Sequence, residues 1–182
     1  MPGKTLLFHW RYDKWDYLNN PGVHDKKNSS MKFIDQIRND PRLLAKRLSM
    51  ISEENAIEYI YFASPRNDWP FIKKITAGLR GVEFVKASSL ETFVKKTVFS
   101  CPDFCGNFDD YFSQIEQELA RLSDIFIYSC FSSWSSNVLI DRLIDGKNEN
   151  YNNIQIIAEI NEENYSSSCL PFFHSSKKKL QN

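Results

Sequence analysis

The sequence predicts an α/β fold, in which an open, mostly parallel, Rossmann-like sheet carries helices on both faces. Three observations support this prediction. Short runs of β-branched and aromatic residues alternate with segments whose apolar residues recur every three or four positions. The resulting β-α-β-α-β-α-β order is typical of parallel sheets, because a crossover between parallel strands usually contains a helix. With 182 residues, the chain is long enough for one well-packed domain.

The composition argues against several classes of protein. Lys and Arg number 23, and so do Asp and Glu, so the chain lacks the basic surplus that generic nucleic-acid binding needs. Aromatic residues make up 14% of the chain, which is more than a disordered chain would carry. We expect no membrane span and no signal peptide in this chain, because no apolar run has the required length. Because the chain opens directly on a predicted strand, we expect it to be a piece of a longer protein.

The first part of the chain predicts a strand, a loop and two helices. Residues 5–9 are a continuous apolar run that ends in a polar tripeptide, and residues 12–30 are polar and indicate a loop. Residues 31–51 carry apolar side chains at helical spacing, interrupted near the middle by Pro41. We therefore expect two helices here, with Asp40 capping the second and Pro41 at its first position.

The middle of the chain predicts a second and a third strand with a helix between them. Residues 56–63 are rich in β-forming side chains, and residues 64–68 follow as a turn. Residues 69–79 show helical spacing and end before Gly81, a common helix stop. Residues 82–85 indicate a short strand.

The remaining elements are less uniform. Residues 86–107 have no clear assignment, whereas residues 108–122 have one apolar face and predict a helix. Residues 123–130 predict a buried strand, and the segment after it opens a helix that continues through Leu143. The last expected strand covers residues 153–160.

We expect one domain over residues 4–165, a nucleotide-sugar-binding lobe by the argument below. Residues 166–182 are rich in Ser and Lys and are expected to form a flexible tail. The four cysteines allow three complete disulfide pairings, and the sequence does not choose among them.

Polar residues follow three of the predicted strands, and this convergence is the main physical argument for a ligand site. They are His9 and Arg11, Ser64 and Asp68, and Ser132 and Ser133. In open parallel sheets, ligands bind at the carboxyl ends of the strands. We therefore expect a binding site at that edge.

Two of these groups suit a phosphate. An arginine at a strand end, here Arg11, can hold a phosphate with two parallel hydrogen bonds, whereas the simpler alternative is a surface pair with Asp13 or Asp16. The serine-rich segment 132–137 opens a helix, where backbone N–H groups and the helix dipole favour anions. The alternative is an ordinary serine N-cap, which needs only one of these residues.

Other chemistries find little support in the sequence. The glycine-rich phosphate loops GxGxxG and GxxxxGK[ST] and the nucleophile elbow GxSxG are missing. Neither the pair Cys101 and Cys105 nor the three histidines have the spacing of a metal site. Asp109 and Asp110 precede a predicted helix and are therefore better explained as N-terminal capping than as a metal clamp.

Three blocks of the sequence resemble the GDP-fucose protein O-fucosyltransferases. The segment 8–11, Phe-His-Trp-Arg, is similar to the family's His-x-Arg motif, and the segment 60–64 is similar to its strand that leads into a polar turn. The segment 124–135 is similar to its Asp-x-Phe-Ile-x-x-Cys-x-Ser-Ser-aromatic segment and is likewise followed by a helix with an arginine, here Arg142. The blocks agree in order and spacing, and the resemblance covers residues 4–146.

The resemblance implies a fold, an activity and a set of site residues. The chain would be the C-terminal lobe of a two-lobed GT-B fold, without the N-terminal lobe, and would transfer fucose from GDP-fucose to a Ser or Thr hydroxyl of a protein domain. Arg11 would be the catalytic residue, because it would neutralise the charge that builds on the departing GDP. His9 would lie beside it at the diphosphate. The other contacts to GDP-fucose would come from Ser132, Ser133, Trp134 and Ser135.

The resemblance also implies which residue contacts guanine, which cofactors are needed and in which compartment the protein acts. The family often has an acidic residue about ten positions before the phenylalanine of the last block, and Glu116 occupies that position here. Glu116 would therefore accept hydrogen bonds from guanine, with a longer side chain than the family's usual Asp. The resemblance implies no metal or other cofactor, and it implies the lumen of the endoplasmic reticulum or Golgi.

Three alternatives stay open. The chain could be a glycan fucosyltransferase-like lobe, since those enzymes share the arginine at the strand end. It could be a guanine-nucleotide-binding module without catalysis. It could also be an unrelated, flavodoxin-like domain whose serine-rich segment holds some other phosphate. Base preference separates the last alternative from the others.

Overall fold

The structure, a computed structural model, describes residues 3–11, 35–98, 106–129, 132–153 and 156. The expected loop 12–30, all four cysteines and the expected tail 166–182 lie outside these residues. The expected boundary at residue 165 lies outside them as well.

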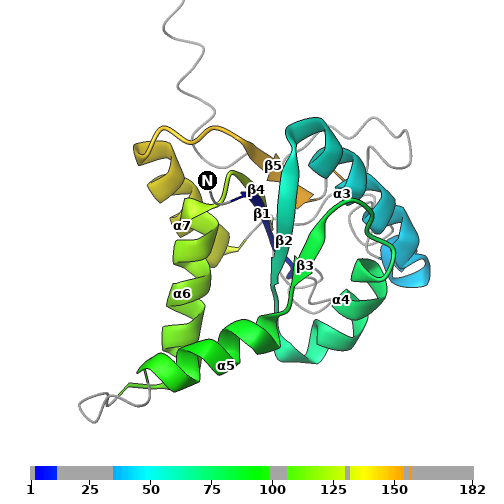
Figure 1. The fold of residues 1–182 in the computed structure, drawn as a ribbon. Coiled ribbons are helices and arrows are strands. Elements are labelled where there is room, and N and C mark those ends of the chain that lie inside the picture. Colours follow the sequence, from blue (N-terminus) through cyan, green and yellow to red (C-terminus); the bar gives the residue numbers. More distant parts are fainter. Residues whose placement is uncertain (1–2, 12–34, 99–105, 130–131, 154–155, 157–182) are drawn as a thin grey trace, which may run out of the picture.

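A parallel five-stranded sheet forms the centre of the molecule (Figure 1). Its strand order is β3-β2-β1-β4-β5. The strands are β1 (Lys4–His9), β2 (Ile57–Ala63), β3 (Glu83–Val85), β4 (Ile125–Tyr128) and β5 (Asn150–Asn152). The predicted α/β fold with a Rossmann-like parallel sheet is therefore confirmed.

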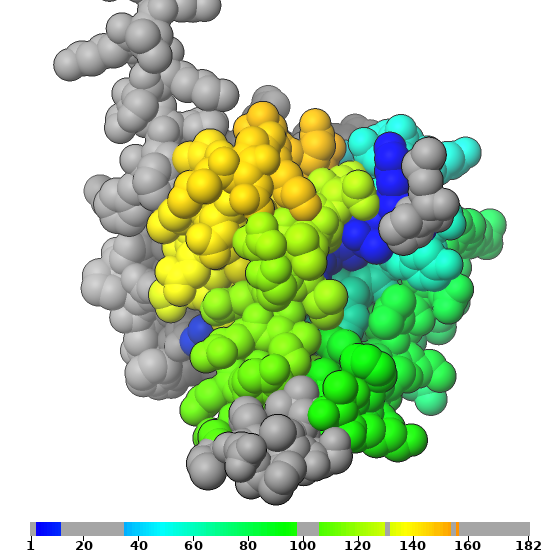
Figure 2. All heavy atoms as spheres, turned by 60° about the vertical axis from the view of Figure 1, so that its left-hand side comes forward, coloured from blue at the N-terminus to red at the C-terminus, as the bar shows by residue number. Residues whose placement is uncertain are grey.

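Helices cover both faces of this sheet. One face carries α3 and α4, and the other carries α5, α6 and α7, of which α6 and α7 lie side by side (Figures 1 and 2). The helices are α3 (Pro41–Asn55), α4 (Trp69–Thr76), α5 (Ala87–Val98), α6 (Phe108–Leu122) and α7 (Ser133–Ile144), with a 3₁₀ turn η2 (Arg66–Asp68) before α4. Within the described residues, no helix is both long and apolar enough to cross a lipid bilayer.

The central strands bury side chains on both faces. In β1, Leu6 and Phe8 belong to the core beneath α3 and α4, while Leu7 between them belongs to the core beneath α6 and α7. In β4, Ile127 and Phe126 divide in the same way. Because both faces are covered, these strands are continuous apolar runs in the sequence rather than alternating ones.

The predicted start of the helix at Pro41 is confirmed. Residues 35–39 are helical, Asp40 then leaves the helical conformation, and its side chain accepts a hydrogen bond from the N–H of Arg42 at 3.2 Å. Pro41 occupies the first turn of α3, where its missing N–H removes no intrahelical hydrogen bond.

Two expectations need correction, and the segment that had no assignment contains a helix. The last strand is β5 (Asn150–Asn152), three residues before the predicted start at 153, and Asn153 and Ile156 are helical instead. Residues 86–107, which had no assignment, contain α5. The cap of α6 is Asn107, and Asp109 lies in the first turn of that helix.

Candidate functional site

The strand order places a topological switch point between β1 and β4. From β1 the chain builds outward through β2 to β3, and it then returns to the other side of β1 to form β4 and β5. The helices α3 and α7, which come after β1 and β4 in the chain, lie on opposite faces of the sheet. In open α/β sheets, a crevice forms at the carboxyl ends of the strands at such a point. Ligands of open α/β sheets bind in such a crevice.

The predicted site residues His9, Trp134 and Ser135 meet at this switch point. His9 ends β1, and its Nδ1 lies 2.7 Å from Oγ of Ser135 in the first turn of α7. The imidazole also packs on the indole of Trp134, with ring centroids 4.1 Å apart. His9 thus joins the end of β1 to the start of α7.

Ser129, the residue after β4, completes this cluster. Its N–H donates to Oγ of Ser135 at 3.0 Å, and its hydroxyl donates to the backbone carbonyl of Arg11 at 3.2 Å. Ser135 therefore contacts both strands of the switch point. Sequence analysis did not select Ser129, although it lies between the β4 run and the serine-rich segment.

Burial keeps the imidazole of His9 neutral. Removal from water, together with the nearby guanidinium of Arg11, lowers the pKa of His9 to about 3. His9 is 7% exposed, and its Nδ1 bonds to a buried residue of the protein, Ser135, rather than to water. A side chain with such a low pKa is a poor base, and we therefore regard His9 as a positioning residue.

Arg11 supplies positive charge at the edge of this cluster. Its side chain is exposed, and its backbone carbonyl is held by Ser129. Its positive charge contributes to the lowered pKa of His9. The site therefore combines a neutral, buried histidine with an exposed cation.

The serine-rich segment opens the helix α7, as the sequence predicts. Ser132 is the N-cap, with its hydroxyl accepting from the N–H of Ser135 at 3.5 Å. The N–H groups of Ser133 and Trp134 lie in the first turn, where an α-helix offers them no carbonyl partner. Together with the helix dipole, they can bind a phosphate.

The four predicted contact residues of this segment differ in how deeply they are buried. Ser132 and Ser135 are 4% and 1% exposed, and their hydroxyls bond within the protein, as the capping alternative expects. Ser133 is exposed. The indole N–H of Trp134 donates to Oγ of Ser113 on α6 at 3.0 Å. Of these four residues, Ser133 is exposed and Trp134 is half-buried, so these two are the ones that a ligand can reach.

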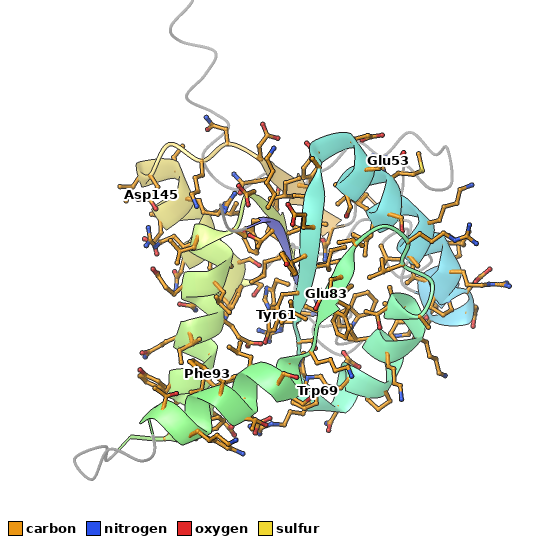
Figure 3. All side chains as sticks on the ribbon, in the orientation of Figure 1. Glu53, Tyr61, Trp69, Glu83, Phe93 and Asp145 are labelled. Atoms are coloured by element: carbon orange, nitrogen blue, oxygen red, sulfur yellow. The ribbon has the colours of Figure 1, made fainter. Side chains whose placement is uncertain are left out.

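Glu116 faces β2 rather than the His9 cluster. Its carboxyl group accepts a hydrogen bond from the hydroxyl of Tyr61 at 2.6 Å, and it is 9% exposed. Tyr61 is labelled in Figure 3. Burial raises the pKa of Glu116 to about 7, while the Tyr61 hydrogen bond and the charge of Arg66 oppose that rise. Glu116 lies one helical turn after Ser113, the partner of Trp134, and its carboxyl group bonds to Tyr61 on β2 and not to the residues of the cluster.

The third predicted polar group consists of Ser64 and Asp68, and of these two residues Asp68 bonds to other side chains of the protein. Asp68 accepts a hydrogen bond from the indole N–H of Trp10 at 3.1 Å and lies 3.8 Å from the guanidinium of Arg38. Ser64 lies apart from the His9 cluster, in a cavity at the ends of β2 and β3. Within the described residues, no group of three or more His, Cys, Asp or Glu side chains could hold a metal ion.

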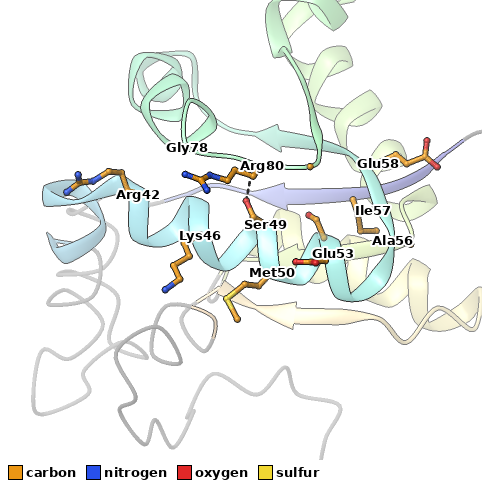
Figure 4. A pocket seen from close by; sticks show the side chains of 12 residues that line it. Arg42, Lys46, Ser49, Met50, Glu53, Ala56, Ile57, Glu58, Gly78 and Arg80 are labelled. Carbon is orange, nitrogen blue, oxygen red and sulfur yellow. Dashed lines mark hydrogen bonds between the residues drawn. The ribbon is translucent and has the colours of Figure 1, made fainter.

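A groove of about 940 Å³ lies at the other end of the sheet (Figure 4). It runs between α3 and the segment before β3, where the N–H of Arg80 donates to Oγ of Ser49 at 3.0 Å. Arg42, Lys46 and Arg80 lie toward one end of this groove, and Glu58 lies toward the other. Because it faces the amino ends of the strands, the groove is separate from the switch point.

Comparisons with protein-family models, with curated proteins and with solved structures found no match to this chain.

Proposed function

We propose that the chain binds GDP-fucose at the switch point between β1 and β4 and is the nucleotide-binding lobe of a protein O-fucosyltransferase. The observation that supports this proposal is the meeting of the His9 end of β1 with the first turn of α7. It brings an exposed arginine and a helix N-terminus to the one edge where α/β sheets bind nucleotides.

Each part of the site has a separate role in the proposal. The N–H groups of Ser133 and Trp134 bind the β-phosphate, and Arg11 supplies the positive charge. His9 and Ser135 hold β1 and α7 in register, so that these groups stay directed at the same ligand. Glu116 would need to leave Tyr61 to bind guanine, so the phosphate contacts do not depend on Glu116, whereas the preference for guanine does.

In the proposed reaction, the hydroxyl oxygen of a Ser or Thr residue attacks C1 of fucose. The bond between C1 and the β-phosphate oxygen breaks, GDP leaves as an anion, and the hydroxyl proton passes to a base. Arg11 stabilises the negative charge that develops on the leaving GDP. His9 is not that base, because its pKa of about 3 leaves it with little affinity for a proton at neutral pH.

Calorimetric titration with GDP, ADP and inorganic phosphate tests the proposal. We expect GDP to bind at least about tenfold more tightly than ADP, a difference of about 1.4 kcal/mol, and phosphate to bind more weakly still. Equal, weak binding of all three would contradict guanine recognition and favour an unrelated phosphate-binding domain. An absence of any nucleotide binding would contradict the proposed site.

Two pairs of variants locate the binding. Arg11→Gln should weaken GDP binding about tenfold, because it removes the cation at the phosphate. Arg80→Gln removes the same charge at the other end of the sheet and should leave the affinity unchanged. Ser133→Trp should block the first turn of α7, whereas Asp141→Trp, on the exposed side of the same helix, should not. Equal effects within either pair would place the nucleotide elsewhere.

A further inference from the structure

A second cavity opens at the carboxyl ends of β2 and β3, on the side of β1 opposite to β4. Its volume is about 470 Å³, within the range of small-molecule sites. The aromatic rings of Phe62 and Phe84 and the side chain of Ile72 form its apolar wall. The cavity can therefore hold an apolar ring or chain.

Two residues that line this cavity each carry a buried polar atom that has no hydrogen-bond partner among the described residues. These atoms are Oγ of Ser64, just after β2, and the indole Nε1 of Trp69, the first residue of α4. Trp69 lies between the starts of α4 and α5 (Figure 3). A buried donor without a partner destabilises a protein, and a ligand whose acceptor atom moves in beside these two groups would satisfy their hydrogen bonds.

Two lysines give the cavity a positive charge. Lys73 on α4 and Lys86 between β3 and α5 both line it, and both are exposed. No acidic residue is among the lining residues, and the structure shows neither lysine in an ion pair with a described residue. The first turn of α5, which begins at Ala87, adds the positive end of a helix dipole.

We propose that this cavity binds a small molecule with an aromatic ring and one anionic group that accepts hydrogen bonds, a carboxylate or a phosphate. The ring lies against Phe62 and Phe84. The anionic group accepts hydrogen bonds from Ser64 and Trp69 and pairs with Lys73 and Lys86. This site is separate from the proposed nucleotide site, because it uses β2, β3 and α5 in place of β1, β4 and α7.

Ligand-detected NMR with benzoate and phenyl phosphate tests the proposal, in the absence of any nucleotide. The two probes distinguish a carboxylate from a phosphate, and benzyl alcohol has the ring without the charge. We expect saturable binding of at least one anion, at least tenfold tighter than that of benzyl alcohol. Equal binding of the alcohol and both anions, or no saturable binding at millimolar concentrations, would overturn the proposal.

Matched variants place the probe in the cavity. The double variant Lys73→Gln/Lys86→Gln should weaken binding of the preferred anion at least tenfold. Lys74→Gln/Lys96→Gln removes two exposed lysines of α4 and α5 that do not line the cavity, and it should bind like the unchanged chain. Equal affinities of the two double variants would overturn the proposal.

The neutral donor is tested by Trp69→Phe, which keeps an aromatic ring and removes the N–H. This variant should bind the anion several-fold more weakly and bind benzyl alcohol as before. Circular dichroism of each variant confirms that it is folded before the affinities are compared. Unchanged anion binding by folded Trp69→Phe would remove the indole from the site.

Discussion

At the scale of single residues, two buried side chains make stability depend on pH in opposite directions. The pKa of Glu116 is raised to about 7, so the folded protein keeps this proton longer than the unfolded chain, where the pKa is 4.5. The pKa of His9 is lowered to about 3 from 6.5, so the folded protein releases that proton first. As pH rises, Glu116 lowers the free energy of unfolding between about 4.5 and 7, and His9 raises it between about 3 and 6.5.

Glu116→Gln should isolate the contribution of Glu116. The amide can still accept the hydrogen bond of Tyr61 but carries no charge at any pH. The stabilising contribution of protonated Glu116 is fully present below pH 4.5 and is lost as pH rises through about 7, a change of about 3 kcal/mol. Urea unfolding at pH 5 and pH 8 should therefore show that the variant gains stability relative to the original chain at the higher pH.

The difference between the two proteins removes the opposing contribution of His9, which both contain. Glu118→Gln is the matched control, because it changes an exposed glutamate on the same helix. Curves of stability against pH that run parallel for Glu116→Gln and the original chain would show that Glu116 ionises normally.

At the scale of elements, Arg142 ties three segments together beneath α7. Its side chain is fully buried, and its guanidinium donates to the carbonyls of Ala120, Ser123 and Asp124 and to Oδ1 of Asn150. These acceptors belong to the end of α6, the entry to β4 and β5. Burial lowers the pKa of Arg142 to about 10, so it remains charged at neutral pH and needs all of these acceptors.

Arg142→Lys should lower the free energy of unfolding by about 3 kcal/mol or more, because one ammonium group cannot reach acceptors on all three segments. Arg121→Lys is the control, since Arg121 pairs with Glu118 and Asp145 on the surface. Thermal or urea unfolding of the two variants measures the difference. If both variants have the same stability, Arg142 does not have the structural role assigned to it.

The helices and strands also show which elements the sequence patterns predict and which they do not. The boundaries of α6 match the prediction because its apolar face is regular and it is bounded by a cap and a strand. In α5, Phe93 is 65% exposed while its neighbour Val94 is buried, so the apolar residues of that segment do not mark one face. β5 contains only Asn-Tyr-Asn, and its pairing with β4, which no local pattern shows, makes it a strand.

In the candidate site, the sequence likewise predicts some features and not others. The positions of His9, Trp134 and Ser135 at strand and helix ends follow from the sequence, because parallel strands bring their carboxyl ends together. The hydrogen bonds among them do not, since those depend on the β1–β4 pairing and on the helix that follows. The pairing of Glu116 with Tyr61 was missed for the same reason, because it joins residues 55 positions apart.

At the scale of the whole molecule, the edge formed by the carboxyl ends of the strands carries two candidate sites. They lie on opposite sides of the central strand β1. The proposed nucleotide site joins β1 to β4 and α7, and the aromatic-anion cavity joins β2 to β3 and α5. The central strand β1 separates them, with pairing partners on both sides. A ligand at either site should therefore stabilise a different set of backbone hydrogen bonds.

Hydrogen exchange should resolve these two sets. If GDP binds as proposed, saturating GDP should slow exchange at the end of β1 and in the first turn of α7 together, because the ligand joins them. Exchange in β3 and at the start of α5 should stay unchanged, and these segments should respond to benzoate or phenyl phosphate instead. ADP at the same concentration is the control for nonspecific phosphate binding. Protection by GDP at β3 and α5, with none at α7, would move the nucleotide to the second cavity and contradict the switch-point site.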